Sequence, residues 1–278
     1  MKKTTVNCQG QLLNVSEPQI MGILNVTPDS FYDGGRYADE SAIINQVERM
    51  LTEGASIIDI GGYSSRPGAK HISEKEELER VIPIVETIHS EFPDAILSVD
   101  TFRSSIVAKA IESGASIIND ISGGELDNKM FEIIAHYNVP YILMHMKGNP
   151  QTMKNESSYK NMMEEIILYF SKKINALRKM GVNDIIIDPG FGFSKTLEQN
   201  YELLHKLNEF KLFELPILVG ISRKSMVNKI LNVKAEDALN GSTALHALAI
   251  TNGANLLRVH DVKEAIEVLK IVKAFQQA

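Results

Sequence analysis

Apolar runs of strand length recur eight times along this chain, and one polar or charged side chain ends each of them. The runs, each with the residue that follows it, are 19–24 with Asn25, 56–58 with Asp59, 95–99 with Asp100, 115–118 with Asn119, 139–144 with His145, 184–187 with Asp188, 216–221 with Ser222 and 254–257 with Arg258. A continuous apolar run is typical of a strand buried on both faces of a parallel sheet. Eight such strands predict an α/β fold, a (β/α)8 TIM barrel. The polar side chains should then meet at the carboxyl-terminal rim, where barrel enzymes place their chemistry.

A short repeat in the sequence supports the barrel. The segment 54–59, Gly-Ala-Ser-Ile-Ile-Asp, recurs almost unchanged at 114–119 and more loosely at 181–186 and 253–258. In each copy a glycine closes a helical stretch and a strand follows at once, as expected for a helix end and a short loop. The copies are too far apart and too irregularly spaced for a solenoid, so the repeat indicates successive βα units.

The segments between the runs have helical periodicity. In 74–90 the apolar residues form one stripe, and Ser73 with Glu76 predicts a capping box at its start. Pro83 inside this stripe should kink the helix. The Ala/Leu-rich segment 236–252 predicts a further helix between the seventh and eighth strands. We expect it to pack on the barrel or to contact a second subunit, because each barrel strand needs only one crossover helix.

Length, composition and charge favour one large domain that does not bind nucleic acid. The chain has 278 residues, a size common for α/β barrels, so we expect a single domain over 1–278 with a short N-terminal extension over 1–18. The hydrophobic share of 44% is enough for a large core. The net charge is −6, the isoelectric point is near 5.7, and no basic block occurs, so nucleic acid is not an expected partner.

Cysteine content and hydropathy predict a soluble, cytoplasmic protein. The single cysteine, Cys8, excludes an internal disulfide framework and is typical of a reducing compartment. We expect Cys8 to be an inert packing residue. The sequence has no apolar stretch of about 18 residues and no signal-peptide core at its start, so no membrane association is expected.

Residues after the first two runs suggest a metal ion and an anion. Asn25 can offer a carbonyl oxygen to a hard cation such as Mg²⁺, which takes few protein ligands beside phosphate oxygens. The alternative is that Asn25 caps the turn. Segment 61–69 contains glycines, Ser65 and Arg66, which suit an anion through backbone N–H groups and a guanidinium group. The alternative for this segment is a solvated surface loop.

Two carboxylates and one amide form the most informative group. Asp100, Asn119 and Asp188 each follow a branched apolar run, so each should point into the mouth of the barrel. Buried carboxylates need partners, because an unpaired buried charge is costly. Together the three side chains match a flat heterocycle rich in N–H donors, such as the guanidine-like edge of a pyrimidine. The alternative is that they bond neighbouring loops or pair with Lys224.

The loops after the sixth and seventh runs can complete such a site. Segment 188–195 carries two glycines and two aromatic residues, and Phe193 could stack on a planar ligand. Ser222 precedes a predicted helix, where a carboxylate or phosphate is favoured. Lys224 could reach across the pocket, or it could be an exposed lysine of the first helical turn. The helix dipole disfavours a cation there, which favours a specific role.

The end of the eighth run indicates an anion site. Arg258 and His260 lie two residues apart and can share one anion, and loops after the last two barrel strands often bind phosphate. A lone histidine is usually structural, but its arginine neighbour at the rim favours the anion.

With these residues the chain resembles the dihydropteroate synthases, a pterin-binding family of bacterial folate synthesis. The most specific segments are Met-Gly-Ile-Leu-Asn-Val-Thr-Pro-Asp-Ser-Phe at 21–31 and Asp-Pro-Gly-Phe-Gly-Phe at 188–193. The other matching segments, in chain order, are 66–68, 98–101, 118–120, 144–146, 222–225 and 258–261. The resemblance extends from about residue 20 to about residue 265.

The resemblance implies condensation of (7,8-dihydropterin-6-yl)methyl diphosphate with 4-aminobenzoate, giving dihydropteroate and pyrophosphate with Mg²⁺ as the cofactor and a homodimer as the assembly. The residues implied for the pterin pocket are Asp100, Asn119, Asp188, Lys224 and Met144. Those implied for the diphosphate and Mg²⁺ are Asn25, Ser65, Arg66, Arg258 and His260. Those implied for the aminobenzoate are Phe193, Pro67 and Ser222.

The implied chemistry passes through a pterin cation. Pyrophosphate would leave first, with Arg258, His260 and Mg²⁺ stabilising its charge, while Asp100 stabilises the cation that the arylamine then attacks. Lys224 belongs to the same implied catalytic group. The family usually has Thr where this chain has Ser65, which keeps the hydroxyl but loses the rigidity of β-branching.

Two alternatives remain from the sequence. A related pterin-binding barrel transfers a methyl group from a methylated folate to a corrinoid protein, but it needs no diphosphate site, which the Arg66 loop and Arg258 with His260 suggest. A catalytically dead homologue should have lost at least one of Asn25, Asp100, Lys224 or His260, and this chain keeps all four.

Overall fold

A computed structural model of the chain describes residues 3–26, 36–64 and 71–278. Within these residues, eight parallel strands form one sheet in the order β8-β7-β6-β5-β4-β3-β10-β9. A parallel bridge between Ile187 and Ile217 joins the two ends of this order, so the sheet closes on itself. The predicted barrel is therefore confirmed. The strands are β3 (Gln19–Asn25), β4 (Ile57–Gly61), β5 (Leu97–Asp100), β6 (Ile117–Asp120), β7 (Tyr141–Met144), β8 (Ile185–Asp188), β9 (Leu218–Val219) and β10 (Leu256–Val259).

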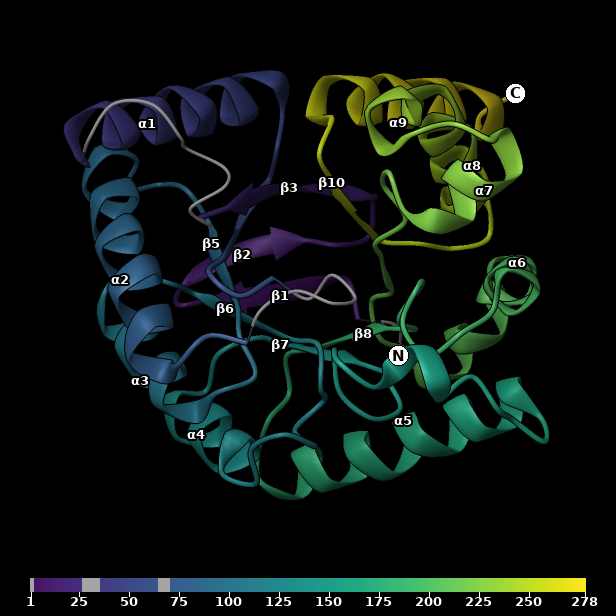
Figure 1. The fold of residues 1–278 in the computed structure, drawn as a ribbon, viewed down its shortest axis with the longest axis horizontal. Coiled ribbons are helices and arrows are strands. Elements are labelled where there is room, and N and C mark those ends of the chain that lie inside the picture. Colours follow the sequence, from purple (N-terminus) through teal and green to yellow (C-terminus); the bar gives the residue numbers. More distant parts are fainter. Residues whose placement is uncertain (1–2, 27–35, 65–70) are drawn as a thin grey trace.

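Helices surround the strands on the outside of the barrel (Figure 1). They are α1 (Arg36–Glu53), α2 (Glu74–Glu91), α3 (Ser104–Glu112), α4 (Met130–Tyr137), α5 (Met162–Lys179), α6 (Leu197–His205), α7 (Ser225–Leu231), α8 (Leu239–Thr251) and α9 (Val262–Gln276). Short 3₁₀ helices occur at Met153–Asn155, Leu207–Phe213 and Ala235–Asp237. Both α7 and α8 lie between β9 and β10, so the predicted extra helix is present. No helix in the described part of the chain is long and apolar enough to cross a membrane.

The start of α2 shows how the sequence defines a helix end. The Ser73 side chain accepts a hydrogen bond from the backbone N–H of Glu76 at 3.1 Å, as the capping box predicts. The Glu76 carboxylate instead accepts from Arg80 one turn later, so only half of the predicted box forms. Pro83 lies within α2, which continues to Glu91. The predicted kink there stays a prediction.

The repeated glycines have the conformation that the sequence repeat requires. Gly54, Gly114, Gly181 and Gly253 have φ angles of +108°, +112°, +88° and +107°, a region that side chains with a Cβ rarely adopt. Each follows the end of a helix by one or two residues and precedes the next strand. These glycines turn the chain from the outer helices back into the barrel wall.

A small antiparallel hairpin, β1 (Thr5–Cys8) and β2 (Gln11–Asn14), packs under the barrel. Its buried side chains Val6, Cys8 and Leu13, with Val15 directly after β2, form one cluster with apolar side chains of seven barrel strands and with Ile96, which directly precedes β5. The barrel members of this cluster, called the lower layer below, are Met21, Ile57, Ile96, Ile117, Ile142, Ile186, Leu218 and Leu256. Cys8 is 3% exposed, and burial raises the pKa of its thiol to about 12, which confirms the predicted inert packing role.

The lower layer determines which side chains enter the site. Successive side chains of a strand point to opposite faces, so the residue two positions beyond a lower-layer residue also faces the barrel interior. On the alternate strands β4, β6, β8 and β10 these residues carry a charge or an amide. They are Asp59, Asn119, Asp188 and Arg258, called the polar layer below. The corresponding residue of β5 is Ser98. Their outward-facing neighbours, such as Ile58 and Leu257, pack with the helices in the main core.

Three details of the sequence prediction are wrong. The second strand does not end at Asp59, because β4 continues through Ile60 to Gly61 and places Asp59 inside the barrel. His145 does not point into the mouth, because Met144 precedes it on the interior face and the alternation turns His145 outward. Its ring packs edge-on against Tyr169 of α5, with the centroids 4.9 Å apart. The seventh strand is also shorter than its apolar run, at Leu218–Val219.

Two glycine substitutions separate backbone strain from steric overlap. Gly181→Ala places a Cβ in open space, so we expect a loss of about 1 kcal/mol in the free energy of unfolding from the positive φ alone. Gly114→Ala has the same kind of strain, but its Cβ would collide with the ring of His89. We expect a further loss of about 1–3 kcal/mol there. Urea unfolding of both variants measures the difference, and equal losses would contradict the packing at His89.

Candidate active site

Asp59 is the most connected side chain of the polar layer. It is fully buried. Ser98 Oγ donates to its Oδ1 at 2.6 Å, while Asn119 Nδ2 and Arg258 Nε donate to its Oδ2 at 3.2 and 2.6 Å. The donors come from β5, β6 and β10, so one carboxylate joins strands on both sides of β4. The sequence analysis assigned no role to Asp59. The apolar residue Ile60 directly after it indicates that the strand continues and that Asp59 lies inside the barrel.

Arg258 links Asp59 to Asp100 across the mouth. Its Nη2 donates to Asp100 Oδ2 at 3.0 Å, and its side chain is 20% exposed. Burial raises the pKa of Asp100 to about 7; the nearby Arg258 opposes this rise, and the negative charge of Asp59 adds to it. The predicted anion-binding Arg258 therefore also serves as the counter-ion of two carboxylates.

Asp188 and Lys224 face each other, as the sequence suggested. Asp188 Oδ1 accepts from the backbone N–H of Gly190 at 2.8 Å. Burial raises the pKa of Asp188, and the charge of Lys224 opposes that rise. Burial lowers the pKa of Lys224 to about 8, which the charge of Asp188 opposes. Lys224 Nζ also donates to the carbonyl oxygen of Phe191 at 2.5 Å, so Lys224 is not an exposed lysine of the first helical turn.

An apolar wall lies beside and above the polar layer. Met144 and Phe193 are 2% and 8% exposed and belong to one buried cluster of rim residues. The other members are Tyr63, Ile72, Phe102, Ile121, Met146 and Met153. Lys224 Nζ lies 4.6 Å from the centroid of the Phe193 ring, a cation–π distance. The mouth thus combines an apolar wall with acidic and cationic groups.

Ser222 and His260 lie together at the rim. His260 Nδ1 is 3.1 Å from Ser222 Oγ, and the backbone N–H of His260 donates to the same oxygen at 3.2 Å. His260 is exposed, whereas Arg258 points into the polar layer. The two predicted anion ligands therefore come from different depths of the same strand end.

Asn25, the predicted metal ligand, lies at the end of β3 beside Gly61. A Cβ on Gly61 would lie 3.9 Å from both Asn25 Oδ1 and Asp100 Oδ2, so glycine keeps the space between these side chains open. In the described ranges no group of three or more His, Cys, Asp or Glu residues could hold a metal ion. An amide oxygen fits Mg²⁺ if a diphosphate supplies further oxygens. Ser65, Arg66 and Pro67 lie outside the described residues.

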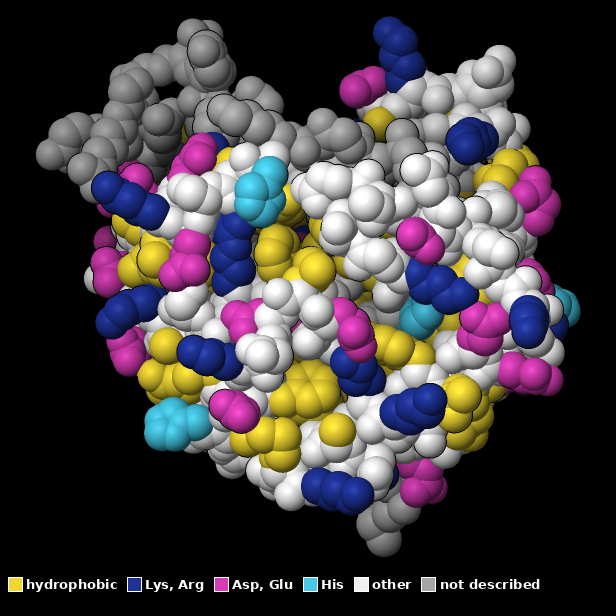
Figure 2. Space-filling view, turned by 60° about the horizontal axis from the view of Figure 1, so that its bottom comes forward, with side chains coloured by type: hydrophobic (Ala, Val, Ile, Leu, Met, Phe, Trp, Pro, Cys, Tyr) yellow, Lys and Arg dark blue, Asp and Glu magenta, His cyan; other side chains and the backbone are white. Residues whose placement is uncertain are grey.

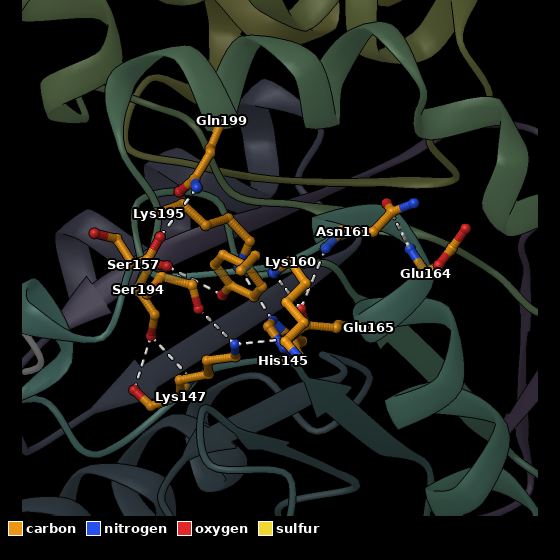
Figure 3. A network of polar contacts seen from close by, with 12 residues as sticks. His145, Lys147, Ser157, Lys160, Asn161, Glu164, Glu165, Ser194, Lys195 and Gln199 are labelled. Carbon is orange, nitrogen blue, oxygen red and sulfur yellow. Dashed lines mark hydrogen bonds and ion pairs between the residues drawn. The ribbon is translucent and has the colours of Figure 1, made fainter.

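A half-buried lysine supports the loop after β8 from behind. Lys195 Nζ donates to the carbonyl oxygens of Gly190 and Phe193, both at 3.0 Å. It also lies 3.2 Å from His145 Nδ1 (Figure 3). Burial lowers the pKa of Lys195 to about 7 and that of His145 well below its usual range. A neutral His145 can accept a hydrogen bond from Lys195 through Nδ1. The sequence pattern of this loop contained Lys195 without indicating that it folds back under the loop.

The loop after β7 is tied to the same support. The Ser194 hydroxyl donates to the carbonyl oxygen of Lys147 and accepts from its backbone N–H, both at 2.8 Å (Figure 3). Lys147 Nζ pairs with Glu165 of α5 at 2.7 Å. Two loops that border the mouth are thus fixed to each other and to α5.

Outside the mouth, the buried carboxylate of Glu77 supports the rim near β5. Glu77 of α2 accepts from Thr101 Oγ1 at 2.7 Å and from Arg103 Nη1 at 2.5 Å. Arg103 Nη2 also donates to the carbonyl oxygen of Ile72 at 2.7 Å. This cluster fixes the segment just before α2. The sequence analysis did not identify this cluster, because Glu77 lies among other charged residues in the first turn of α2, where a solvent-exposed side chain is expected.

Acidic and basic side chains are interspersed over the face shown in Figure 2. The figure shows no block of one sign. The strong local charges are instead buried in the mouth, where water screens them least.

Comparison with known proteins identifies close relatives of the whole barrel. A family model described as pterin binding enzyme matches residues 21–260. The dihydropteroate synthase of Escherichia coli (strain K12) is 44% identical over 268 residues, covering 96% of this chain and 94% of that protein. The Yersinia pestis dihydropteroate synthase in a sulfonamide drug complex has a TM-score of 0.92 at 44% identity, covering 99% of this chain and 100% of that chain. The Xanthomonas albilineans dihydropteroate synthase with 4-aminobenzoic acid has a TM-score of 0.92 at 36% identity, covering 100% of both chains.

The Lys195 environment predicts a pH-dependent contribution to stability. Its pKa falls from 10.5 to about 7 in the folded protein, so between these values the unfolded chain binds a proton that the folded chain does not. Stability then rises with pH. The free energy of unfolding of the wild type, relative to Lys195→Met, should therefore increase from pH 7 to pH 9. Urea unfolding at both pH values measures this, and a constant difference would show that Lys195 is not held in a desolvated site.

Proposed function

We propose a role for each residue of the barrel mouth. The premise is that this chain belongs to the pterin-binding enzyme family and, within it, to the dihydropteroate synthases. It is a transferase of folate synthesis. It condenses (7,8-dihydropterin-6-yl)methyl diphosphate with 4-aminobenzoate to give 7,8-dihydropteroate and pyrophosphate. The relatives are named for this synthesis, which leaves the methyl-transfer alternative without support.

The observation that carries the proposal is the arrangement of the acceptors Asp100, Asn119 and Asp188 around one mouth. A pterin edge presents several N–H donors in a plane, and carboxylates accept them in charge-assisted hydrogen bonds. Asn119 donates to Asp59 through its Nδ2, which leaves its Oδ1 as an acceptor for the ring. Met144 would form the apolar wall against the ring face, and Lys224 would donate to its oxygen or nitrogen atoms.

The diphosphate would lie above this ring, between Arg258 and His260. A guanidinium has five N–H donors, and Asp59 and Asp100 accept from two of its nitrogens. The remaining donors are available to the leaving group. Ser65 and Arg66 would complete this end from the loop after β4. Asn25 would hold Mg²⁺, which when bound neutralises charge on the diphosphate oxygens.

The aminobenzoate would occupy the rim beside the pterin. Phe193 offers a ring for stacking, Ser222 a hydroxyl for the carboxylate, and Pro67 an apolar contact. A relative crystallised with 4-aminobenzoic acid supports this substrate. The arylamine needs no strong base, because it attacks as a neutral nucleophile.

Charge separation across the mouth supports a dissociative reaction. The leaving pyrophosphate would gain stabilisation from Arg258 and His260, while the carboxylate of Asp100 would stabilise the pterin cation left behind. Asp100 pairs with Arg258 before the reaction, and this cation opposes the rise of the Asp100 pKa to about 7 and so favours the ionised form that this role requires. The amine then attacks the cationic methylene carbon and loses its proton to water.

Replacing single carboxylates tests this division of roles. Asp100→Asn keeps the shape but removes the negative charge, so kcat should fall by about 10²-fold, or about 2.7 kcal/mol at the transition state. The change in pterin affinity should be smaller. Asp188→Asn, assigned to ring recognition, should weaken pterin binding at least as strongly as it lowers the rate. Pyrophosphate release in steady state measures both variants. A raised Kd with wild-type kcat for Asp100→Asn would leave Asp100 as a recognition residue only.

The same assay tests the function and the metal. Pyrophosphate release by the wild type should depend on 4-aminobenzoate, and release that is independent of it would contradict the synthase activity. Removing Mg²⁺ with a chelator should raise KM for the diphosphate substrate, and Asn25→Ala should reproduce part of that loss. Full activity without Mg²⁺ would remove the metal from the proposal.

We also propose that the protein is a cytoplasmic homodimer that associates through α7, α8 and α9. These three helices lie together in Figure 1. They carry exposed apolar side chains, namely Ile230, Leu231, Leu248, Ile271 and Phe275, which are 45–73% exposed. Apolar patches rimmed by polar residues mark association surfaces. The extra helix α8 then has a role that the barrel itself does not require.

A charged side chain on this face should dissociate the dimer. Leu248 is 52% exposed, and Leu248→Glu should shift the protein to the monomer in size-exclusion chromatography with light scattering. Leu168→Glu is the matched control, because Leu168 of α5 is 54% exposed and lies outside this face. A wild-type monomer at micromolar concentration, or equal effects of both substitutions, would refute the proposed interface.

A further inference from the structure

The polar layer has four members, and Asp59 is the one that the reaction scheme above does not use. Its carboxylate is fully buried, below the level at which Asp100 and Asn25 flank Gly61. It accepts hydrogen bonds from two side chains of the proposed pterin and diphosphate site, Asn119 and Arg258. Through Arg258 it is linked to Asp100.

We propose that Asp59 is a positioning residue for the condensation: it orients Asn119 and Arg258, and through Arg258 it orients Asp100, without contacting either substrate. This inference rests on the proposed function, because it names what holds the proposed ligands in place. It assigns the arrangement of the mouth to a group beneath it.

The orientation of Asn119 follows from the chemistry of a carboxylate. An ionised carboxylate only accepts hydrogen bonds, so Asn119 must turn its Nδ2 towards Asp59 and its Oδ1 away. An amide at position 59 could donate as well as accept. Asn119 could then turn over and present N–H groups to a ring edge that itself carries N–H donors.

The orientation of Arg258 follows from two bonds on one planar group. Nε donates to Asp59 Oδ2 at 2.6 Å, while Nη2 donates to Asp100 Oδ2 at 3.0 Å. Two fixed contacts define the plane of a guanidinium and therefore the direction of its other N–H groups. Without the Asp59 contact, Arg258 keeps only its bond to Asp100 and can rotate about it.

The alternative is that Asp59 only stabilises the barrel. A buried carboxylate with several donors on the same barrel offers the control. Asp120 of β6 is also fully buried and accepts from Ser122, Gly124 and Tyr141. Its side chain faces outward, away from the mouth, because Asn119 before it faces inward. Asp120→Asn thus makes the same chemical change at a carboxylate to which Asn119 and Arg258 do not donate, since they donate to Asp59 instead.

Steady-state pyrophosphate release distinguishes the two roles. Asp59→Asn should lower kcat by about 10-fold or more and raise KM for the dihydropterin diphosphate by about 10-fold. KM for 4-aminobenzoate should change by less than about threefold, since Asp59 makes no contact with Phe193 or Ser222. Asp120→Asn should lower the melting temperature but leave the kinetic constants per folded molecule within about threefold of wild type.

A double-mutant cycle tests whether Asp59 acts through Asn119. In the Asn119→Ala background, Asp59→Asn should raise KM for the pterin substrate clearly less than it does alone, because the amide to be oriented is missing. Additive effects would overturn the proposal, as would wild-type constants for Asp59→Asn or equal rises in both KM values.

Two further outcomes are also decisive. If Asp59→Asn does not fold, Asp59→Ser provides a smaller neutral side chain, for which the same kinetic pattern is expected; failure of both to fold would make Asp59 a folding residue and overturn the proposal. The wild type is assayed in parallel. No release by the wild type refutes the function itself, whereas wild-type release with an unchanged Asp59→Asn variant refutes only the role of Asp59.

Discussion

The ion pairs of Arg258 hold the barrel mouth together. Its guanidinium bridges Asp59 of β4 and Asp100 of β5 from β10 on the other side of β3. Without this cation, two carboxylates would lie close together with little water and no positive partner, which is costly. The same logic applies to Asp188 beside Lys224. Arg258 and Lys224 thus oppose the rise that burial causes in the pKa values of Asp100 and Asp188, and so favour the charged forms that suit a pterin ring.

The polar layer depends on the apolar layer beneath it. Eight side chains of the barrel wall and four of the hairpin segment fill the lower interior, so the barrel is a packed core and not a pore. That packing keeps water out from below and fixes the height of the residues two positions further on. The hairpin at the N-terminus, which contributes nothing to the mouth directly, therefore helps to define its floor.

The rim is supported from the outside as well. Lys195 and His145 lie behind the loop after β8, and Lys147 with Ser194 joins that loop to the one after β7. These groups give the loop that carries Phe193 a fixed path, although few of its residues are in regular structure. The loop therefore forms a rigid wall at this side of the mouth.

The sequence alone determined the fold class and most of the candidate site. Continuous apolar runs identify buried parallel strands, the recurring glycines identify the helix ends, and the residues after the runs include Asn119, Asp188 and Arg258. These are local properties of the chain.

The sequence did not determine which face of each strand a polar residue occupies. Asp59 and His145 both follow apolar runs, but only the closed barrel shows that Asp59 points inward to three partners and that His145 points outward to α5. The reason is that a strand alternates its side chains every residue, so the face depends on where the strand begins and how it pairs with its neighbours. Arg258 bridges two carboxylates that are far from it in sequence, and only the tertiary structure brings them together. The same holds for Lys195, which folds beneath its own loop and away from the site.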